Sequence, residues 1–171
     1  CAFMADPQST SKHDRLLTER LQGWQPDVRG TLLFLRDADR VLLIRKKRGH
    51  GAGKINGPGG KIDPGETPLS AALRETHEEV NIPPDAVDVI GSLGIHKGGL
   101  GFSVTPVIGL VDAAAPLRPC PREVDEIFEI PLAFVADLTN HITEERKLEG
   151  VPYKMYAAPY GRYHIWGLTA G

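Results

Sequence analysis

The chain has 171 residues, of which 41% are hydrophobic and 25% charged, and its formal net charge is −2. This length predicts one globular domain with its own core, and the nearly balanced charge argues against nucleic acid or an anionic membrane as a partner. The chain has no apolar run of the roughly 18 to 20 residues that a membrane helix needs, and two cysteines are too few for a disulfide framework. We therefore expect a cytoplasmic protein with a single domain over residues 4–171, in which Met4 is the natural start and residues 1–3 are a foreign remnant.

The first predicted elements are a helix and a hairpin. Residues 11–23 carry leucines at helical spacing and end in a glycine, which predicts a helix. Residues 28–35 and 41–44 are rich in side chains typical of strands, and the polar residues 36–40 between them favour a hairpin.

A basic and glycine-rich segment, residues 45–60 (RKKRGHGAGKINGPGG), follows the hairpin. Its glycines predict an irregular loop rather than a helix or a strand. Arg45, Lys46, Lys47 and Lys54 could hold phosphate oxygens, and a solvated basic loop is an equal alternative for each of them.

A helix is predicted over residues 68–80. Thr67 is a good N-cap with Pro68 after it, and Asn81 can adopt the left-handed conformation that ends a helix. One stripe of side chains at helical spacing is expected to face the core: Leu69, Ala72, Leu73, Thr76 and Val80.

The remaining chain alternates strands with one further helix. Residues 87–96, 102–111 and 126–130 are predicted strands, and a helix is expected to begin at Pro131 and to continue to residue 138. Residues 151–166 are expected to return to the sheet. This order of elements predicts a mixed sheet layered with helices.

Three glutamates, Glu75, Glu78 and Glu79, are crowded on one side of the predicted helix. Like charges three and four residues apart repel each other, and Arg74 alone cannot neutralise three carboxylates. A solvated charged face is one interpretation. The other is a divalent cation, because the glycine-rich turn before the helix offers backbone carbonyls, and Mg²⁺ is held by a few carboxylates together with substrate phosphates.

Residues 60–82, GKIDPGETPLSAALRETHEEVNI, resemble the Nudix signature G-x5-E-x7-R-E-U-x-E-E-x-G-U, in which U is apolar. The matching positions are Gly60, Glu66, Arg74, Glu75, Glu78, Glu79 and Ile82. Thr76 stands at an aliphatic position and Asn81 at a glycine position, and neither departure touches the chemistry. The resemblance implies an α/β (α+β) fold, the Nudix-type α/β/α sandwich with a mixed central sheet and a loop–helix–loop catalytic motif. It also implies hydrolysis of the diphosphate in a nucleoside diphosphate linked to another moiety.

The resemblance implies roles for the acidic residues and a metal cofactor, Mg²⁺ with Mn²⁺ as a substitute. Glu75 and Glu79 would be metal ligands, Glu78 would share a metal or help to activate the water, and the Gly60 carbonyl would add a ligand. Arg74 and Glu66 would pair and fix the helix against its loop. Candidates for a further ligand from outside the signature are Glu123 and Glu126, for which a role in a surface strand is an equal rival.

The substrate is the most open part of this interpretation. Residues 53–66 are similar to the branch that hydrolyses oxidised purine deoxynucleoside triphosphates, in which an asparagine at the place of Asn56 reads the base. Residues 101–111, 123–141 and 159–171 resemble coenzyme A diphosphatases, although that branch has Phe-Pro-Gly-Gly where this chain has residues 57–60, Gly-Pro-Gly-Gly. The expected substrate-binding residues are Arg45, Lys47, Lys54, Asn56, Gly59, Lys61 and Phe102.

Coenzyme A or a derivative is thus the leading candidate, and an 8-oxo-dGTP type of nucleoside triphosphate is the alternative. A Nudix-like module that binds a nucleotide without cutting it is a third possibility, although such proteins are expected to have lost acidic residues that are all present here. The expected partner is a small nucleotide diphosphate, with no nucleic acid and no membrane, and pairing of two copies is left open.

Overall fold

The computed structural model describes residues 26–37, 39–48, 52–98, 101–148 and 151–171, so the helix predicted over residues 11–23 lies outside it. The described strands and helices are β1 (Val28–Asp37), β2 (Arg40–Lys46), β3 (Ile55–Asn56), α2 (Pro68–Val80), β4 (Val87–Ser92), β5 (His96–Gly98), β6 (Phe102–Val111), β7 (Val124–Pro131), α3 (Leu132–Ala136), β8 (Ile142–Leu148), β9 (Val151–Tyr160) and β10 (Tyr163–Trp166). Short 3-10 turns cover Pro84–Ala86, Leu138–Asn140 and Gly167–Thr169. None of the helices in these ranges combines the length and apolar character that crossing a bilayer requires.

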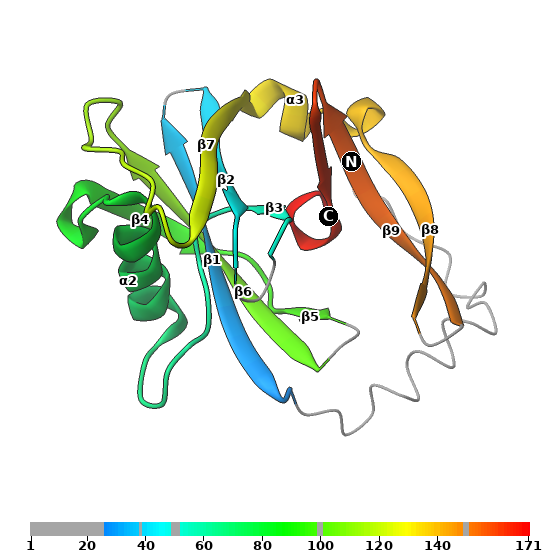
Figure 1. The fold of residues 1–171 in the computed structure, drawn as a ribbon, viewed down its shortest axis with the longest axis horizontal. Coiled ribbons are helices and arrows are strands. Elements are labelled where there is room, and N and C mark those ends of the chain that lie inside the picture. Colours follow the sequence, from blue (N-terminus) through cyan, green and yellow to red (C-terminus); the bar gives the residue numbers. More distant parts are fainter. Residues whose placement is uncertain (1–25, 38, 49–51, 99–100, 149–150) are drawn as a thin grey trace, which may run out of the picture.

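The fold is built on a seven-stranded main sheet, with the path β3-β2-β1-β6-β4, in which β5 also pairs with β6 and β7 with β2. The sheet is mixed, because β1 and β6 are parallel and the other pairs are antiparallel. Helix α2 covers one side of it, and a second sheet of β8, β9 and β10 lies on the other side (Figure 1). The predicted fold class, a mixed central sheet with a loop–helix–loop segment, is confirmed, and most of the layer opposite α2 consists of strands.

The glycine-rich turn of the Nudix-like segment is inserted between two strands of the main sheet. β1 and β2 form the predicted hairpin and then separate, and residues 55–62 lie between them. β3 pairs with β2 on one side. On the other side, the backbone amide of Thr31 donates to the Gly60 carbonyl at 2.9 Å. The amide of Leu33 likewise donates to the Pro58 carbonyl at 2.7 Å. The turn is therefore fixed by backbone hydrogen bonds rather than left as a free loop.

The main sheet is buried on both faces because successive side chains of its strands alternate. Leu42 and Ile44 of β2 belong to the core under α2. Val41 and Leu43, the alternate residues, belong to a second core with residues of β9 and β10. Within the described residues the chain thus forms two cores that share one sheet.

Several sequence predictions need correction. The segment 45–60 is not irregular throughout, since its first two residues continue β2 and two others form β3. The strand predicted over residues 87–96 is two strands, β4 and β5, which pair with different parts of β6. A register shift between Val89 and Gly91 already disturbs the first of them. Sequence periodicity alone does not reveal such interruptions, because they depend on the partner strand.

The C-terminal predictions were also partly wrong. The helix expected from Pro131 to residue 138 is limited to α3, Leu132–Ala136, because Pro131 still ends β7 and acts as the N-cap. The tail does form strands over residues 151–166, but they pair with β8 in a sheet of their own instead of joining the main sheet.

Candidate active site

Helix α2 begins and ends where the sequence predicts, because side chains cap its N-terminus and the left-handed backbone of Asn81 caps its C-terminus. The Thr67 hydroxyl accepts a hydrogen bond from the Ser70 amide at 3.1 Å, and the Ser70 hydroxyl accepts one from the Thr67 amide at 3.0 Å. This reciprocal pair is a capping box. At the other end Asn81 takes the left-handed conformation, with φ 63°.

One side of α2 is buried against the sheet, and it includes a carboxylate. The buried residues are Ala71, Ala72, Thr76, Glu79 and Val80. The prediction that Leu69 faces the core was wrong. Leu69 lies in the first turn and is 42% exposed, so the sheet covers the stripe only from residue 71 onward. Glu79, which the charge pattern assigned to another side, is fully buried.

Arg74 connects helix α2 to the preceding loop through hydrogen bonds and ion pairs. Its Nε and Nη2 donate to the two carboxylate oxygens of Glu66 at 2.9 and 3.0 Å, a bidentate pair. Nη1 also donates to Glu75 at 3.0 Å and to Glu78 at 3.3 Å, and Nη2 donates to the Lys61 carbonyl at 3.2 Å. The hydrogen bond to Glu66 raises the pKa of Arg74 and lowers the pKa of Glu66. Arg74 therefore stays charged and orients the neighbouring carboxylates.

Glu79 is bound to the glycine turn and to a buried lysine. Its Oε2 accepts a hydrogen bond from the Gly59 amide at 2.8 Å, and its Oε1 lies 2.6 Å from Nζ of Lys46. The same Nζ donates to the Gly59 carbonyl at 2.6 Å. Burial raises the pKa of Glu79, and the positive charge of Lys46 opposes this shift.

Glu75 lies against the neighbouring glycine of the same turn. A Cβ added to Gly60 would be 2.4 Å from the carboxyl carbon of Glu75, so a glycine is needed to leave room for this carboxylate. Burial raises the pKa of Glu75, and its hydrogen bond with Arg74 opposes the shift. Glu75 and Glu79 thus both contact the turn formed by Gly59 and Gly60.

The oxygen atoms of Glu75, Glu79 and the glycine turn are suitable ligands for a divalent cation. The buried carboxylate of Glu79, the largely buried one of Glu75 and the carbonyls of a glycine turn are hard oxygen ligands of the kind that Mg²⁺ takes. Over the described residues, no three acidic, histidine or cysteine side chains already converge as a metal cluster. Lys46 pairs with Glu79, and Arg74 pairs with Glu75 and Glu78. The carboxylates are therefore held by cationic side chains in this arrangement.

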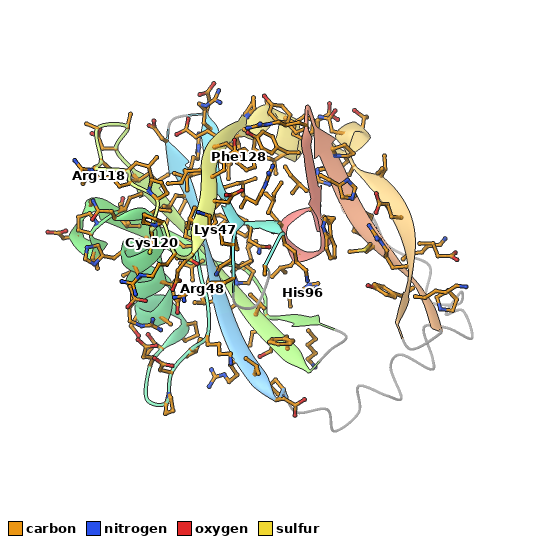
Figure 2. All side chains as sticks on the ribbon, viewed as in Figure 1. Lys47, Arg48, His96, Arg118, Cys120 and Phe128 are labelled. Carbon is orange, nitrogen blue, oxygen red and sulfur yellow. The ribbon has the colours of Figure 1, made fainter. Side chains whose placement is uncertain are left out.

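The predicted outside ligand Glu123 lies in a turn that is attached to α2. The amide of Cys120 in this turn donates to the Glu79 carbonyl at 2.8 Å. Figure 2 shows Cys120 and Arg48 in the region beside α2, whereas Phe128 lies farther along β7 toward α3. The Glu123 carboxylate itself pairs with Arg48 at 2.5 Å.

The other predicted outside ligand, Glu126, lies on the opposite face of the sheet from the α2 carboxylates. It is paired across the strands with Arg45 and shares a side of β7 with Phe128, which packs in the second core. Its carboxylate contacts Arg45 at 3.5 Å, the Tyr163 hydroxyl at 2.8 Å, and Arg162. The structure does not bring Glu126 to Glu75, Glu78 or Glu79.

Two predicted substrate-binding residues contact the C-terminal segment. The Oδ1 of Asn56 accepts a hydrogen bond from the Thr169 hydroxyl at 3.1 Å. The Nζ of Lys54 lies 4.8 Å from the centre of the Trp166 ring, a cation–π contact. The end of the chain therefore lies beside β3, next to the glycine turn.

The other predicted substrate-binding residues are more scattered. Lys47 and Lys61 are exposed, and Nζ of Lys47 donates to the Pro121 carbonyl at 3.0 Å. Phe102 is half-buried at the start of β6. Gly59 has φ +154°, and a Cβ there would be 2.2 Å from the carbonyl oxygen of Thr31, so it belongs to the framework of the turn.

The position of Lys46 was not anticipated. The sequence groups it with the exposed basic residues of the loop, but its side chain is only 8% exposed and points to Glu79. A signal was available, because Leu42, Ile44 and Lys46 are alternate residues of one strand and the first two are apolar.

Comparisons with known proteins agree with this geometry. Residues 26–148 match the family model of the NUDIX domain. The chain is 41% identical to the protein named "Uncharacterized Nudix hydrolase NudL" of Yersinia pestis (strain Pestoides F). The alignment extends over 141 residues, which are 82% of this chain and 67% of that protein. Among solved structures, a Nudix hydrolase of M. smegmatis, RenU, is 28% identical with a TM-score of 0.51, over 60% of this chain and 69% of that one.

A C. elegans Ap4A hydrolase is 22% identical with a TM-score of 0.53, over 62% of this chain and 81% of that one, and it supports the fold alone. Members of the family generally use divalent metals. The chain belongs to the Nudix family, and it is a hydrolase that acts on pyrophosphate bonds of nucleotide-linked small molecules.

Proposed function

We propose that the protein is a Mg²⁺-dependent diphosphohydrolase and that coenzyme A, or a derivative of it, is its substrate. The observation that carries this proposal is the contact of Glu75 and Glu79 with the turn of Gly59 and Gly60, next to an arginine that is bound to both the loop and the helix. Carboxylate and carbonyl oxygens this close together are the kind of ligands that a metal shared with a diphosphate takes, which supports the proposal.

In this mechanism Glu75 and Glu79 would hold the metal, with Glu78 and the Gly60 carbonyl as further ligands. The bound ion supplies neutralisation of the leaving phosphate and a more acidic water. Glu78 is the most exposed of the three carboxylates, with 56% of its side chain exposed, so we assign to it the acceptance of a proton from the attacking water. Arg74 fixes the positions of Glu75 and Glu78 through its bidentate pair with Glu66.

The contact between Asn56 and Thr169 supports coenzyme A over an oxidised purine nucleotide. Reading a purine edge needs the amide of Asn56 as a free donor and acceptor. Its Oδ1 already accepts a hydrogen bond from Thr169, which uses one of the two lone pairs of that oxygen, and Thr169 belongs to the segment that resembles coenzyme A diphosphatases. The part of the chain that carries this resemblance thus contacts Asn56, the residue that the other resemblance assigns to reading the base.

The metal assignment is tested with Glu79→Gln, which keeps the shape of the side chain and removes its charge. We expect hydrolysis with Mg²⁺ to fall at least about a hundredfold, since even residues behind metal ligands change activity by about 10- to 100-fold. Glu129→Gln, on an exposed carboxylate paired with Arg40, is the control. Equal turnover by Glu79→Gln and the parent protein would reject the assignment.

The substrate is tested by comparing kcat/KM for coenzyme A, 8-oxo-dGTP, dGTP and ADP-ribose, with the products identified by mass spectrometry. We expect coenzyme A to be preferred and to yield phosphopantetheine and adenosine 3′,5′-bisphosphate. Asn56→Ala should then leave the rate with coenzyme A nearly unchanged. A preference for 8-oxo-dGTP that disappears in Asn56→Ala would support the alternative substrate, and equal rates with all four compounds would reject both.

A further inference from the structure

Lys46, Glu79 and the backbone amide and carbonyl of Gly59 form a closed ring of contacts inside the protein. Nζ of Lys46 contacts both Oε1 of Glu79 and the Gly59 carbonyl at 2.6 Å, and the Gly59 amide contacts Oε2 of Glu79 at 2.8 Å. The Lys46 side chain is 8% exposed and the Glu79 side chain is not exposed. The ammonium group therefore neutralises a carboxylate that water does not reach.

The backbone around Lys46 is arranged to direct this side chain inward. Lys46 continues the alternation of Leu42 and Ile44, whose side chains lie in the core under α2, and the extra residue at the register shift beside it, Asp125, belongs to β7. The Lys46 amide donates to the Lys54 carbonyl at 3.1 Å, and the Lys46 carbonyl accepts from the Gly53 amide at 2.8 Å. Both contacts attach this position to the start of the glycine turn.

The positive charge of Lys46 lowers the affinity of Glu79 for a metal ion. A buried carboxylate without a counter-charge is strongly destabilising, so Glu79 needs the ammonium group as its counter-charge when no metal is bound. An ammonium group 2.6 Å from Oε1 also repels a divalent cation that approaches the same carboxylate. Lys46 therefore stabilises the metal-free protein and weakens its affinity for the metal.

We propose that Lys46 is a positioning residue whose permanent positive charge holds Glu79 and the glycine turn in place. The same charge makes tight binding of the metal depend on the presence of the substrate. The diphosphate brings negative charge that offsets the repulsion, in keeping with the way Mg²⁺ is commonly held jointly by protein carboxylates and substrate phosphates. The hydrogen bond to the Gly59 carbonyl gives the ammonium a partner that does not depend on Glu79. This inference rests on the proposed role of Glu79 as a metal ligand.

The test measures Mn²⁺ binding without substrate, from the electron paramagnetic resonance signal of free Mn²⁺. Lys46→Gln removes the charge and keeps a donor for the Gly59 carbonyl, and we expect it to bind Mn²⁺ at least about tenfold more tightly than the parent protein. Lys46→Arg keeps the charge and should match the parent, as should the exposed control Lys154→Gln. Equal or weaker binding by Lys46→Gln would overturn the inference.

Glu79→Gln in the same titration separates this inference from the proposed function. If Glu79→Gln binds Mn²⁺ as well as the parent does, the metal assignment fails and the inference with it. If Glu79→Gln loses affinity but Lys46→Gln gains none, only the role of Lys46 is rejected.

Thermal unfolding supplies a readout that does not depend on catalysis. Without metal, Lys46→Gln should have a lower Tm than the parent, and saturating Mn²⁺ should raise its Tm by more than it raises that of the parent. Lys46→Met, which also lacks the charge, should behave in the same way. If either variant is unfolded without metal, Mn²⁺ should restore its fold. A variant that stays unfolded in the presence of Mn²⁺ contradicts the inference. A variant that is as stable as the parent in the absence of Mn²⁺ also contradicts it.

Discussion

Gly60 is the residue that leaves the Glu75 carboxylate its place beside the turn. A Cβ at this position would lie 2.4 Å from the carboxyl carbon and one carboxyl oxygen of Glu75. We therefore expect Gly60→Ala to fold, with Glu75 displaced and activity lowered at least about tenfold, as for residues that orient metal ligands. Circular dichroism and kcat/KM measure the two effects.

Neighbouring glycines provide controls for this substitution. Gly59→Ala should impair folding itself, because φ is +154° and the new Cβ would be 2.2 Å from the carbonyl oxygen of Thr31. Gly53→Ala meets no atom within 4 Å, so its positive φ of +76° should cost only about 1 to 2 kcal/mol and leave activity intact. Full activity in Gly60→Ala would show that Glu75 does not need its present position.

Thr76 has a buried hydroxyl without a hydrogen-bond partner in the described part of the chain. Valine has nearly the same shape and no polar group to desolvate, so Thr76→Val should raise the free energy of unfolding by about 1 kcal/mol. Denaturant titration measures this change. A loss of stability would mean that the hydroxyl has a partner outside the described residues or in the solvent.

The pair of Glu66 and Arg74 should make stability depend on pH. The hydrogen bond from Arg74 lowers the pKa of Glu66 below its ordinary 4.5, so its contribution is present above that value and is lost as the pH falls through the lowered folded-state pKa. Glu66→Gln should therefore lower Tm near neutral pH, and the difference from the parent should vanish in strong acid. The effect should be small because the pair is partly exposed. A difference in Tm that stays constant over this range would contradict the ionic explanation.

At the scale of elements, the first turn of α2 depends on its capping box. Thr67→Ala and Ser70→Ala each remove one half of the reciprocal pair, and each should lower the free energy of unfolding by about 1 kcal/mol. Because the two side chains bond to each other's backbone, the double variant should lose less than the sum of the two. Denaturant titration of all three variants gives the coupling, and strict additivity would show that the two halves act independently.

The extent to which elements were predictable follows from the range of the interactions that define them. The bounds of α2 were predictable because Thr67, Pro68 and Asn81 act on backbone groups of the helix itself. β3 and the bulge near Lys46 were not, since both are set by strands distant in sequence. The same distinction holds in the site. The pair of Arg74 with Glu66 was predictable, because the signature fixes both residues.

At the scale of the whole molecule, the two cores share the strands of the main sheet, so they should unfold together. Ile165 of β10 is 2% exposed in the core between the two sheets. Ile165→Ala should lower the free energy of unfolding by about 2 to 5 kcal/mol, and unfolding should remain a single transition. Calorimetry tests both statements. Two separate transitions would show that the β8, β9 and β10 sheet melts independently.

The parallel pairing of β1 with β6, in which Thr31 lies opposite Thr105, affects how this protein is made. The ribosome releases β1 long before β6, and everything between them, α2 included, is synthesised in the interval. Contacts between residues so far apart in sequence form late and slowly. The nascent chain thus carries all of its signature residues before β6 completes the main sheet, and the apolar strands β1 and β2 are exposed to aggregation until β6 emerges.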